Sequence, residues 1–252
     1  MIKTKRKSIS IIMKEQQAYR SLAKYYDLIY HWKDYKKEAK QVIDYISKFK
    51  QTEGNTLLDV ACGSGSHLQY FADSFNCTGI DLNAEIIEIA RKKLPEIDFI
   101  QADMSDFNLQ KKFDIITCLF SSIGYITSKD KLAKTFEQFA KHMKKGGLLL
   151  IEPWLSKEIF TEGTPHMIIY DSKDLKIARL NINEIKDDIS YFEMHYLIAE
   201  KNRKVQHFVD KHEMAMFPIE LLIELMESNG YKTQFLKEDM FSVRGLLVGV
   251  KE

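Results

Sequence analysis

Cysteine is scarce in this 252-residue sequence, and the few cysteines present limit the classes of protein to which it can belong. Cys62, Cys77 and Cys118 are odd in number, and no two of them form a close pair. A disulfide framework needs an even number and a zinc ribbon needs closely spaced pairs, so the sequence predicts neither. Reduced cysteines are typical of the cytoplasm, where we expect the protein to work.

The sequence is also poor in proline, in glycine and in net charge. Its 4 prolines and 11 glycines argue against long disordered linkers. The formal net charge of +1 lacks the positive excess of proteins that bind nucleic acid through phosphates, so no nucleic-acid partner is expected. No apolar run is long enough to span a membrane, and the stretch at residues 9–13 is too short for a signal peptide. We therefore expect a globular protein without a membrane partner.

Strand-like and helix-like patterns alternate up to Pro153, which is typical of a parallel sheet covered on both faces. Apolar residues spaced by three and four predict the helices, and short apolar runs predict the strands. The predicted helices are 33–49, 66–75, 83–94 and a segment with the stripe Leu132, Phe136, Phe139 and Met143, ended by Gly146 and Gly147; the predicted strands are 56–61, 77–82, 97–101, 113–119 and 148–152.

After Pro153 the apolar residues alternate with a period of two, which indicates antiparallel strands. A helix at 218–230 and strands at 231–237 and 245–250 then complete the chain. We predict an α/β fold: a Rossmann-like, seven-stranded, mostly parallel sheet with helices on both faces, plus an antiparallel β insertion after the fifth strand. The predicted domains are a disordered basic tail at 1–14, with Met1 or Met13 as the true start, a ligand-binding domain at 15–153 and 218–252, and a β-rich insertion at 154–217.

A glycine-spaced turn follows the first predicted strand in the segment LLDVACGSGSH. Its pattern, Asp59-x-Ala61-x-Gly63-x-Gly65, lacks the Lys-Ser/Thr ending with which a Walker loop holds nucleotide phosphates. It also lacks the third glycine of a good dinucleotide fingerprint. The turn predicts that the backbone approaches a ligand closely, without identifying that ligand.

Acidic residues stand at the ends of three consecutive predicted strands. Asp81, in GIDLN, is placed to accept both hydroxyls of a ribose, a geometry shared by dinucleotide and adenosine sites. Asp103, in QADM, is placed to meet an adenine amino group, and Met104 offers an apolar face to the ring. Asp59 is expected to be nearly buried, where it can fix the turn or a bound ammonium. Any one acid could be a helix cap, but three beside a glycine turn favour a binding site.

The segments LLDVACGSG, GIDLN, QADM and FDIITCLF, within residues 56–152, resemble the successive motifs of class I S-adenosylmethionine-dependent methyltransferases. The resemblance implies S-adenosylmethionine as the cofactor. It places the turn residues Ala61, Gly63 and Gly65 near the methionine part of the cofactor, Asp81 at the ribose, and Asp103 with Met104 at the adenine. Leu82 and Leu119 count among the cofactor-binding residues by the same resemblance. Ala61 replaces the usual first glycine, which is a common and small variant.

A closer resemblance covers nearly the whole chain and rests on YDLIY, FSSIGYI, GGLLLIEPW and RGLLVGV. These segments are similar to those of the N-methyltransferases of nucleotide-linked amino sugars, such as the dTDP-3-amino sugars. The absence of an Asn/Asp-Pro-Pro-Tyr motif after the fourth strand argues against a nucleobase acceptor. The family implies a homodimer, with the insertion used for dimerisation and substrate binding.

The same resemblance assigns the acceptor-side residues. Tyr30 and Tyr125 flank the sugar amine as the catalytic pair, and Tyr35 touches the methionine end of the cofactor; Trp154 lines the sugar pocket, and Arg244, helped by Arg179, meets the diphosphate. Arginine suits this role because its planar fork matches phosphate oxygens. No metal is expected.

Simpler interpretations of these residues stay open. Tyr30 and Tyr35 could pack an N-terminal helix. Trp154 could be a rigid corner after a strand, and Arg244 could be a surface charge. The expected function is transfer of a methyl group to an amino sugar by alignment of the reacting atoms. The alternatives are methylation of another small-molecule amine, hydroxyl or carboxylate, and a non-catalytic protein that binds the cofactor.

Overall fold

The structure is a computed structural model that describes residues 22–237 and 244–252. The predicted tail at 1–14, and the start of the domain up to residue 21, lie outside the described residues. The chain divides into two compact units, which are described separately below. The larger unit comprises residues 34–161, 185–190 and 213–252, and the smaller unit includes 22–33, 162–184 and 191–212.

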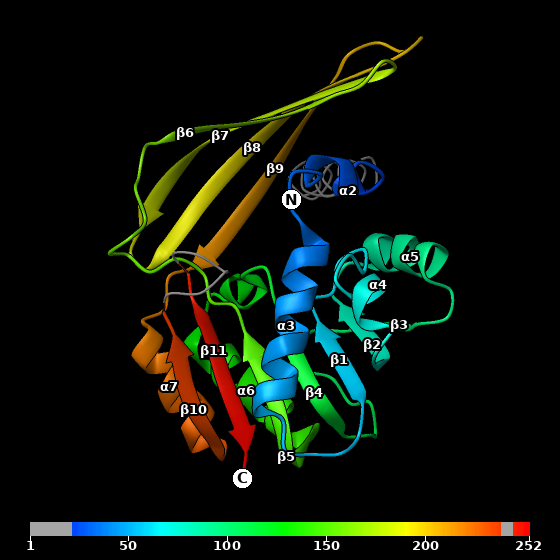
Figure 1. Cartoon of the computed structure of the whole chain (residues 1–252). Coiled ribbons are helices and arrows are strands. Elements are labelled where there is room, and N and C mark those ends of the chain that lie inside the picture. Colours follow the sequence, from blue (N-terminus) through cyan, green and yellow to red (C-terminus); the bar gives the residue numbers. More distant parts are fainter. Residues whose placement is uncertain (1–21, 238–243) are drawn as a thin grey trace, which may run out of the picture. The chain divides into compact units, whose positions relative to one another are not determined.

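A seven-stranded sheet forms the centre of the larger unit, in the order β10-β11-β5-β4-β1-β2-β3 (Figure 1). Its strands are β1 (Thr56–Val60), β2 (Asn76–Asp81), β3 (Asp98–Gln101), β4 (Phe113–Cys118), β5 (Met143–Ile151), β10 (Tyr231–Leu236) and β11 (Leu246–Lys251). The pairs among β1 to β5 are parallel, whereas β11 is antiparallel to both β5 and β10. The predicted mostly parallel sheet of seven strands is therefore confirmed.

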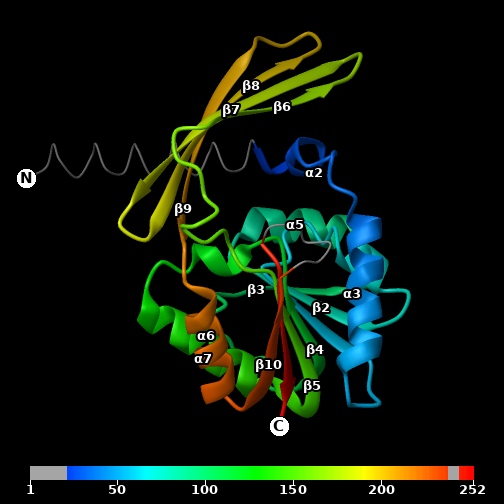
Figure 2. The same ribbon diagram turned by 60° about the vertical axis from the view of Figure 1, so that its left-hand side comes forward.

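Helices cover both faces of this sheet, and Figure 2 shows the sheet between α3 on one side and α6 and α7 on the other. The helices are α3 (Tyr35–Phe49), α4 (Leu68–Phe71), α5 (Ala84–Lys93), α6 (Lys129–Lys141) and α7 (Ile219–Ser228). Consecutive residues of β4 point to opposite faces, so Ile115 packs with α3, α4 and α5 while Ile116 packs with α6 and α7. Strands buried on both faces read as continuous apolar runs, which is why the sequence predicted them.

The helix α3 follows directly from its sequence. The side chain of Asp34 caps it by accepting a hydrogen bond from the backbone N–H of Lys37 at 2.9 Å. Its buried residues, Ala39, Val42 and Ile46, lie three and four positions apart on one face. The predicted helix at 33–49 is thus confirmed, with a start two residues later.

Two predicted boundaries near Gly146 are wrong. Met143 does not belong to the stripe of α6 but is the first residue of β5, paired with Phe113 of β4. Between this pair and the pair Ile115–Leu148 the register shifts, so the extra residues of β5 form a bulge. Gly146 takes a positive φ of 77° within the bulge. The glycine pair therefore lies inside the strand and does not end the helix.

The helix predicted at 66–75 is also shorter in the structure, where α4 has only four residues. The backbone around it mixes hydrogen bonds to the third and the fourth preceding residue, as for Tyr70 N and Phe71 N, which both donate to the carbonyl of His67. Such mixed turns stop a regular helix from extending.

The smaller unit contains most of a four-stranded sheet in the order β6-β7-β8-β9, whose ends at residues 185–190 and 213–215 group with the larger unit. Its strands are β6 (Pro165–Asp171), β7 (Leu175–Lys186), β8 (Ile189–Glu200) and β9 (Gln206–Ala215), and the short helix α2 (Tyr26–Ile29) belongs to the same unit. β6 and β7 pair antiparallel, with Met167 opposite Leu180. The predicted antiparallel insertion after the fifth strand is confirmed.

The grouping of segments differs from the predicted domains. Leu22, Tyr25 and Ile29 share a hydrophobic cluster with Ile177 and Ile198 of the insertion strands, so residues 22–33 belong to the smaller unit. Residues 154–161, 185–190 and 213–217, all within the predicted insertion, group with the larger unit. Burial of apolar side chains decides this grouping, and sequence order does not.

All three cysteines lie in the larger unit, and all are free and buried. Burial raises the pKa of each thiol above its ordinary value, and that of Cys77 to about 12. Within the described residues no group of histidine, cysteine and acidic side chains is suited to hold a metal ion. No described helix combines the length and the apolarity needed to cross a membrane.

Candidate active site

The glycine turn connects β1 to α4 at the carboxyl end of the parallel strands. Ala61 starts it with a left-handed φ of 56°, and Gly63 and Gly65 follow with φ of 56° and 76°. The turn is attached to β2 because Cys62 N donates to the carbonyl of Ile80 at 3.0 Å. A methyl group on Gly65 would lie 3.0 Å from a side-chain carbon of Leu94, so glycine is needed there for space as well as for conformation.

We predict that Ala61→Gly leaves the protein at least as stable as the wild type, with a gain of up to about 1 kcal/mol. A left-handed conformation costs a non-glycine residue roughly 1–2 kcal/mol, which outweighs the entropy that glycine adds to the unfolded chain. Thermal unfolding of the two proteins measures the difference. The matched control is Ala133→Gly inside α6, which is expected to cost about 1 kcal/mol. Equal destabilisation by both changes would contradict the prediction.

Asp81 fastens the turn and faces the candidate ligand site. One carboxylate oxygen accepts the backbone N–H of Gly63 at 2.9 Å, and the other accepts that of Asn83 at 2.9 Å. Burial raises the pKa of Asp81, although these backbone hydrogen bonds oppose the shift. Each oxygen retains a further lone pair, which can accept a ribose hydroxyl. Beside it Leu82 is 67% exposed and offers an apolar surface.

Asp103 and Met104 follow the end of β3. Asp103 Oδ1 accepts hydrogen bonds from the backbone N–H and the hydroxyl of Ser105, at 2.8 and 2.7 Å. Burial would raise the pKa of Asp103, but these bonds and the charge of Lys131 lower it, so the carboxylate is ionised at neutral pH. Met104 is half-buried and packs on the α6 side of the core. The ionised carboxylate of Asp103 can accept a hydrogen bond from an adenine amino group. The half-buried thioether of Met104 can cover the adenine ring.

Asp59 is only 3% exposed, as the sequence predicted. Thr117 of β4 donates a hydrogen bond from its hydroxyl to Asp59 Oδ1 at 2.7 Å. Burial raises the pKa of Asp59 to about 6, and the nearby imidazole of His67 opposes the shift. This carboxylate lies in β1, just before the turn, where it can stabilise the turn or bind an ammonium group.

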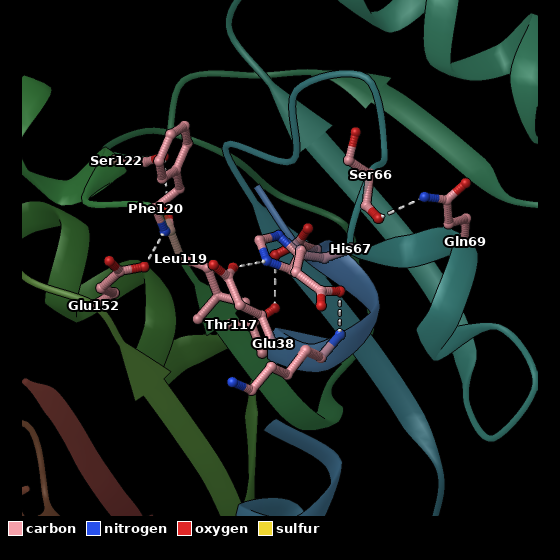
Figure 3. A network of polar contacts seen from close by, with 12 residues as sticks. Glu38, Ser66, His67, Gln69, Thr117, Leu119, Phe120, Ser122 and Glu152 are labelled. Atoms are coloured by element: carbon pink, nitrogen blue, oxygen red, sulfur yellow. Dashed lines mark hydrogen bonds and ion pairs between the residues drawn. The ribbon is translucent and has the colours of Figure 1, made fainter. Parts of the chain in front are cut away.

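His67 connects the turn to α3. Its Nε2 lies 3.0 Å from Glu38 Oε2, and the ring of Tyr35 meets the imidazole edge-on at a centroid distance of 4.9 Å. Figure 3 shows His67 close to Glu38, with Thr117 and the strand end at Leu119 nearby. The first turn of α3, which carries Tyr35, is thereby attached to the residues that follow the glycine turn. Sequence analysis missed Glu38, because a glutamate early in a helix is an ordinary dipole-compensating residue.

The segment after β4 carries the predicted acceptor-side residue Tyr125. Phe120 and Ser121 both take left-handed φ, 53° and 61°, and the 3-10 helix η1 (Ser122–Tyr125) follows. Tyr125 is 48% exposed. A methyl group on Gly124 would lie 2.9 Å from Trp154 Cβ, so glycine at this position lets the segment pack against Trp154.

Trp154 is held at its other end as well. Its indole N–H donates to Ser190 Oγ at 2.9 Å, and Ser190 Oγ donates to the carbonyl of Met214 at 2.9 Å. The tryptophan therefore has a fixed orientation beside η1, which suits a pocket wall and equally the rigid corner considered from the sequence.

Arg244 reaches the same segment from the chain before β11. Its Nη1 donates to Ser121 Oγ at 3.2 Å, and its Nη2 forms an ion pair with Glu152 Oε1 at 2.9 Å. Glu152 is fully buried, and its other oxygen accepts the backbone N–H of Phe120 at 2.6 Å, as Figure 3 shows. The structure thus brings Tyr125, Trp154 and Arg244 to one segment. Sequence analysis missed Glu152, although a charged residue ending the apolar run LLLIE was a usable signal.

Tyr30 and Arg179 come together in the smaller unit. The guanidinium carbon of Arg179 lies 5.7 Å from the centre of the Tyr30 ring. Burial raises the pKa of Tyr30; the charge of Arg179 opposes this shift and that of Asp210 adds to it. Arg179 is buried together with Asn181 and Asn183, while their strand neighbours Leu180 and Ile182 are exposed. Between Arg179 and Asn183 the polar side chains of β7 are therefore the buried ones.

Comparison with known proteins identifies the family. A methyltransferase domain model matches residues 57–147. The dTDP-3-amino-3,4,6-trideoxy-alpha-D-glucopyranose N,N-dimethyltransferase of Streptomyces venezuelae is 34% identical over 228 residues, which cover 89% of this chain and 95% of that protein. The dTDP-3-amino-3,6-dideoxy-alpha-D-glucopyranose N,N-dimethyltransferase of Streptomyces fradiae is 32% identical and covers 91% and 90%. The chain belongs to this family of sugar N-methyltransferases.

Solved structures agree with the assignment. The crystal structure of DesVI from Streptomyces venezuelae matches with a TM-score of 0.86 at 33% identity, over 91% of this chain and 98% of DesVI. The S-adenosylmethionine-bound structure of CalS10, an amino pentose methyltransferase from Micromonospora echinaspora, matches with a TM-score of 0.79 at 26% identity, over 87% and 92%. The resemblance predicted from the motifs is confirmed, and the cofactor of this methyltransferase is S-adenosylmethionine.

The residues of the larger unit fit this cofactor chemically. A left-handed, glycine-containing turn allows close backbone approach, the Asp81 carboxylate suits two hydroxyls, and Leu82 adds an exposed apolar surface beside it. When bound, S-adenosylmethionine supplies a methyl group activated by its positively charged sulfur.

Proposed function

We propose that this methyltransferase acts on the amino group of a dTDP-linked amino sugar. The observation that carries the proposal is the extent of the similarity to enzymes named for such substrates. It covers about nine-tenths of the chain, and so includes the insertion and the acceptor-side segments besides the cofactor-binding motifs. A shared cofactor site alone would match only a segment such as residues 57–147, to which the methyltransferase domain model corresponds.

We assign the acceptor-side roles from the same family. Tyr125 and Tyr30 are proposed to flank the sugar amine, Trp154 to line the sugar pocket, and Arg244 and Arg179 to bind the diphosphate. The exposed phenol of Tyr125, next to the anchored Trp154 and Arg244, supports this assignment for the larger unit. A partly exposed arginine whose guanidinium is held in place is well suited to two phosphate oxygens.

The proposed reaction is an in-line displacement. The lone pair of the neutral amine forms the new N–C bond while the S–C bond breaks, its electrons remain on sulfur, and the amine loses one proton to solvent. The protein contributes by aligning nitrogen, carbon and sulfur, which can lower the barrier by roughly 7–11 kcal/mol. Because burial raises the pKa of Tyr30, its phenol stays protonated at neutral pH and orients the amine by a hydrogen bond.

Tyr125→Phe and Tyr30→Phe are each expected to lower kcat by about ten- to a hundredfold with little change in the KM for the sugar. Loss of an orienting hydrogen bond misplaces the amine without removing a required proton acceptor. Steady-state kinetics of the two variants measure the effect. A fall in kcat of more than about 10⁴-fold at unchanged KM would show that a tyrosine is an obligatory base and contradict alignment as the main contribution.

Mass spectrometry tests the proposed function directly. The protein is incubated with S-adenosylmethionine and a panel of dTDP-linked 3-amino and 4-amino sugars. A gain of one or two methyl masses on one sugar supports the proposal and gives the extent of methylation. If no sugar gains mass while S-adenosylhomocysteine still raises the melting temperature, the acceptor is a different small molecule.

We also propose a cytoplasmic homodimer. Met167, Leu180 and Ile182 are exposed on neighbouring positions of β6 and β7, and form an apolar stripe of the kind that a second copy can cover. The three free, buried cysteines suit a reducing compartment. Sedimentation velocity of the wild type and of Leu180→Glu tests the dimer, which the charge on the stripe is expected to dissociate. A wild type that sediments as a monomer would refute it.

A further inference from the structure

Two consecutive residues after β4 adopt a backbone conformation that they would avoid in isolation. Phe120 and Ser121 both have a left-handed φ, which costs a non-glycine residue roughly 1–2 kcal/mol. Such a conformation persists only where its surroundings determine it. The turn directly precedes η1, which ends at Tyr125, so the residues that hold the turn also position the acceptor side of the site.

The carboxylate of Glu152 holds Phe120 and Ser121 in this left-handed conformation. Glu152 directly follows β5, its side chain is 0% exposed, and Oε2 accepts the Phe120 N–H at 2.6 Å. The next carbonyl, that of Pro153, accepts the hydroxyl of Ser121 at 2.8 Å. Glu152 and Pro153, which follow β5, thus hold Phe120 and Ser121, which follow β4.

The second oxygen of Glu152 fixes Arg244. The ion pair between Oε1 and Nη2 is 2.9 Å long, and Nη1 of the same guanidinium donates to Ser121 Oγ at 3.2 Å. The arginine side chain remains 21% exposed. A buried carboxylate is costly unless it is paired, so the ion pair between Glu152 and Arg244 is maintained. Because Ser121 contacts the other nitrogen, the guanidinium is held at two points in one orientation.

We propose that Glu152 is a positioning residue of this methyltransferase: it sets the Phe120–Ser121 turn and orients Arg244 before the substrate binds. It acts through these residues and does not contact the reacting atoms. The part of the proposal that concerns substrate binding rests on the proposed function, in which Arg244 meets the diphosphate.

Kinetics of a double-mutant cycle test the action through Arg244. Glu152→Gln keeps the volume and an oxygen for Phe120 N–H, but removes the charge that orients the guanidinium. We expect it to raise the KM for the nucleotide sugar at least about tenfold and to change kcat far less. In an Arg244→Lys background, which lacks the fork, Glu152→Gln should have no further effect on KM. Effects on KM that multiply in the double variant would overturn the proposal.

The control variant is Asp114→Asn, which removes another buried, hydrogen-bonded carboxylate at the other end of β4. It should lower the melting temperature without raising the KM, whereas a merely structural role of Glu152 predicts the same result for both variants. If Glu152→Gln does not fold, Ser121→Ala removes the hydroxyl between Arg244 and Pro153, and should raise the KM in the same direction. An unchanged KM in Ser121→Ala would overturn the proposal.

Fluorescence gives a readout that needs no acceptor. Trp32 and Trp154 are the two tryptophans of the chain, so Trp32→Phe leaves Trp154, which packs on Gly124 of η1, as the reporter. In this background Glu152→Ala, which removes the acceptor of the Phe120 N–H as well as the charge, should raise acrylamide quenching of Trp154 at least about twofold, because local opening exposes the indole. Asp114→Asn should not. If no panel sugar is methylated, the proposed function fails while quenching still decides the positioning role; unchanged quenching would refute it.

Discussion

Asp81→Asn is expected to weaken binding of S-adenosylhomocysteine by about 100-fold or more, the largest loss of cofactor affinity predicted for a single change. The carboxylate accepts the N–H groups of Gly63 and Asn83 and is placed to accept two ribose hydroxyls. Hydrogen bonds to a charged group contribute about 1.5–3 kcal/mol each, and every 1.4 kcal/mol is a factor of ten. The asparagine NH₂ would also face one of these donors. Isothermal titration calorimetry measures the affinity.

Asp98→Asn is the matched control. Asp98 is an exposed acid at the start of β3, so this substitution makes the same chemical change away from the site. It should bind S-adenosylhomocysteine as the wild type does. Wild-type affinity in Asp81→Asn would mean that the ribose is held elsewhere, and would remove the central residue of the assigned cofactor site.

Asp114→Asn is expected to reduce the free energy of unfolding at neutral pH by about 2–3 kcal/mol. The side chain is 1% exposed and accepts hydrogen bonds from Thr56 N at 3.0 Å, Thr56 Oγ1 at 2.6 Å and Lys144 Nζ at 2.8 Å. Burial would raise its pKa, but the bonds from Lys144 and Thr56 lower it to about 2, from 3.8. A shift of this size corresponds to about 2 kcal/mol of stability by linkage.

The sign of the pH dependence follows from the lowered pKa. The contribution of Asp114 is fully present above about pH 4, and is lost as the pH falls toward about 2, where the carboxylate is protonated in the folded state too. Urea unfolding at several pH values should therefore show a steeper loss in the wild type than in Asp114→Asn over this range. The exposed Asp73→Asn serves as control, and equal slopes in Asp114→Asn and the wild type would contradict the assignment.

The parts of the fold that the sequence predicted depend on local patterns. The strands β1, β2 and β4 are short segments that are almost wholly buried, and β1 and β4 are mostly apolar. The helix α3 has a capping Asp34 and a stripe of buried residues. The positions of Asp59 and Asp81 follow from the same patterns, because the ends of parallel strands share one edge of a sheet.

The parts that the sequence could not predict depend on partners distant in the chain. Met143 could extend the stripe of α6, and only its pairing with Phe113 makes it the start of a strand. The carboxylate of Glu152 needs Phe120, 32 residues earlier, and Arg244 beyond the next helix. The buried Arg179 lies on the face that alternation alone would assign to solvent. In each case a tertiary contact overrides the local preference.

The positions of the three buried thiols allow opening of the larger unit to be followed by thiol labelling of the unmodified protein. Reaction with a thiol reagent needs an exposed thiolate, and burial disfavours both exposure and ionisation in the folded chain. Since no cysteine lies in the smaller unit, the labelling rate measures opening of the larger unit alone. Cys62 stands inside the glycine turn, so its rate relative to Cys77 follows occupancy of the cofactor site in the unmodified protein.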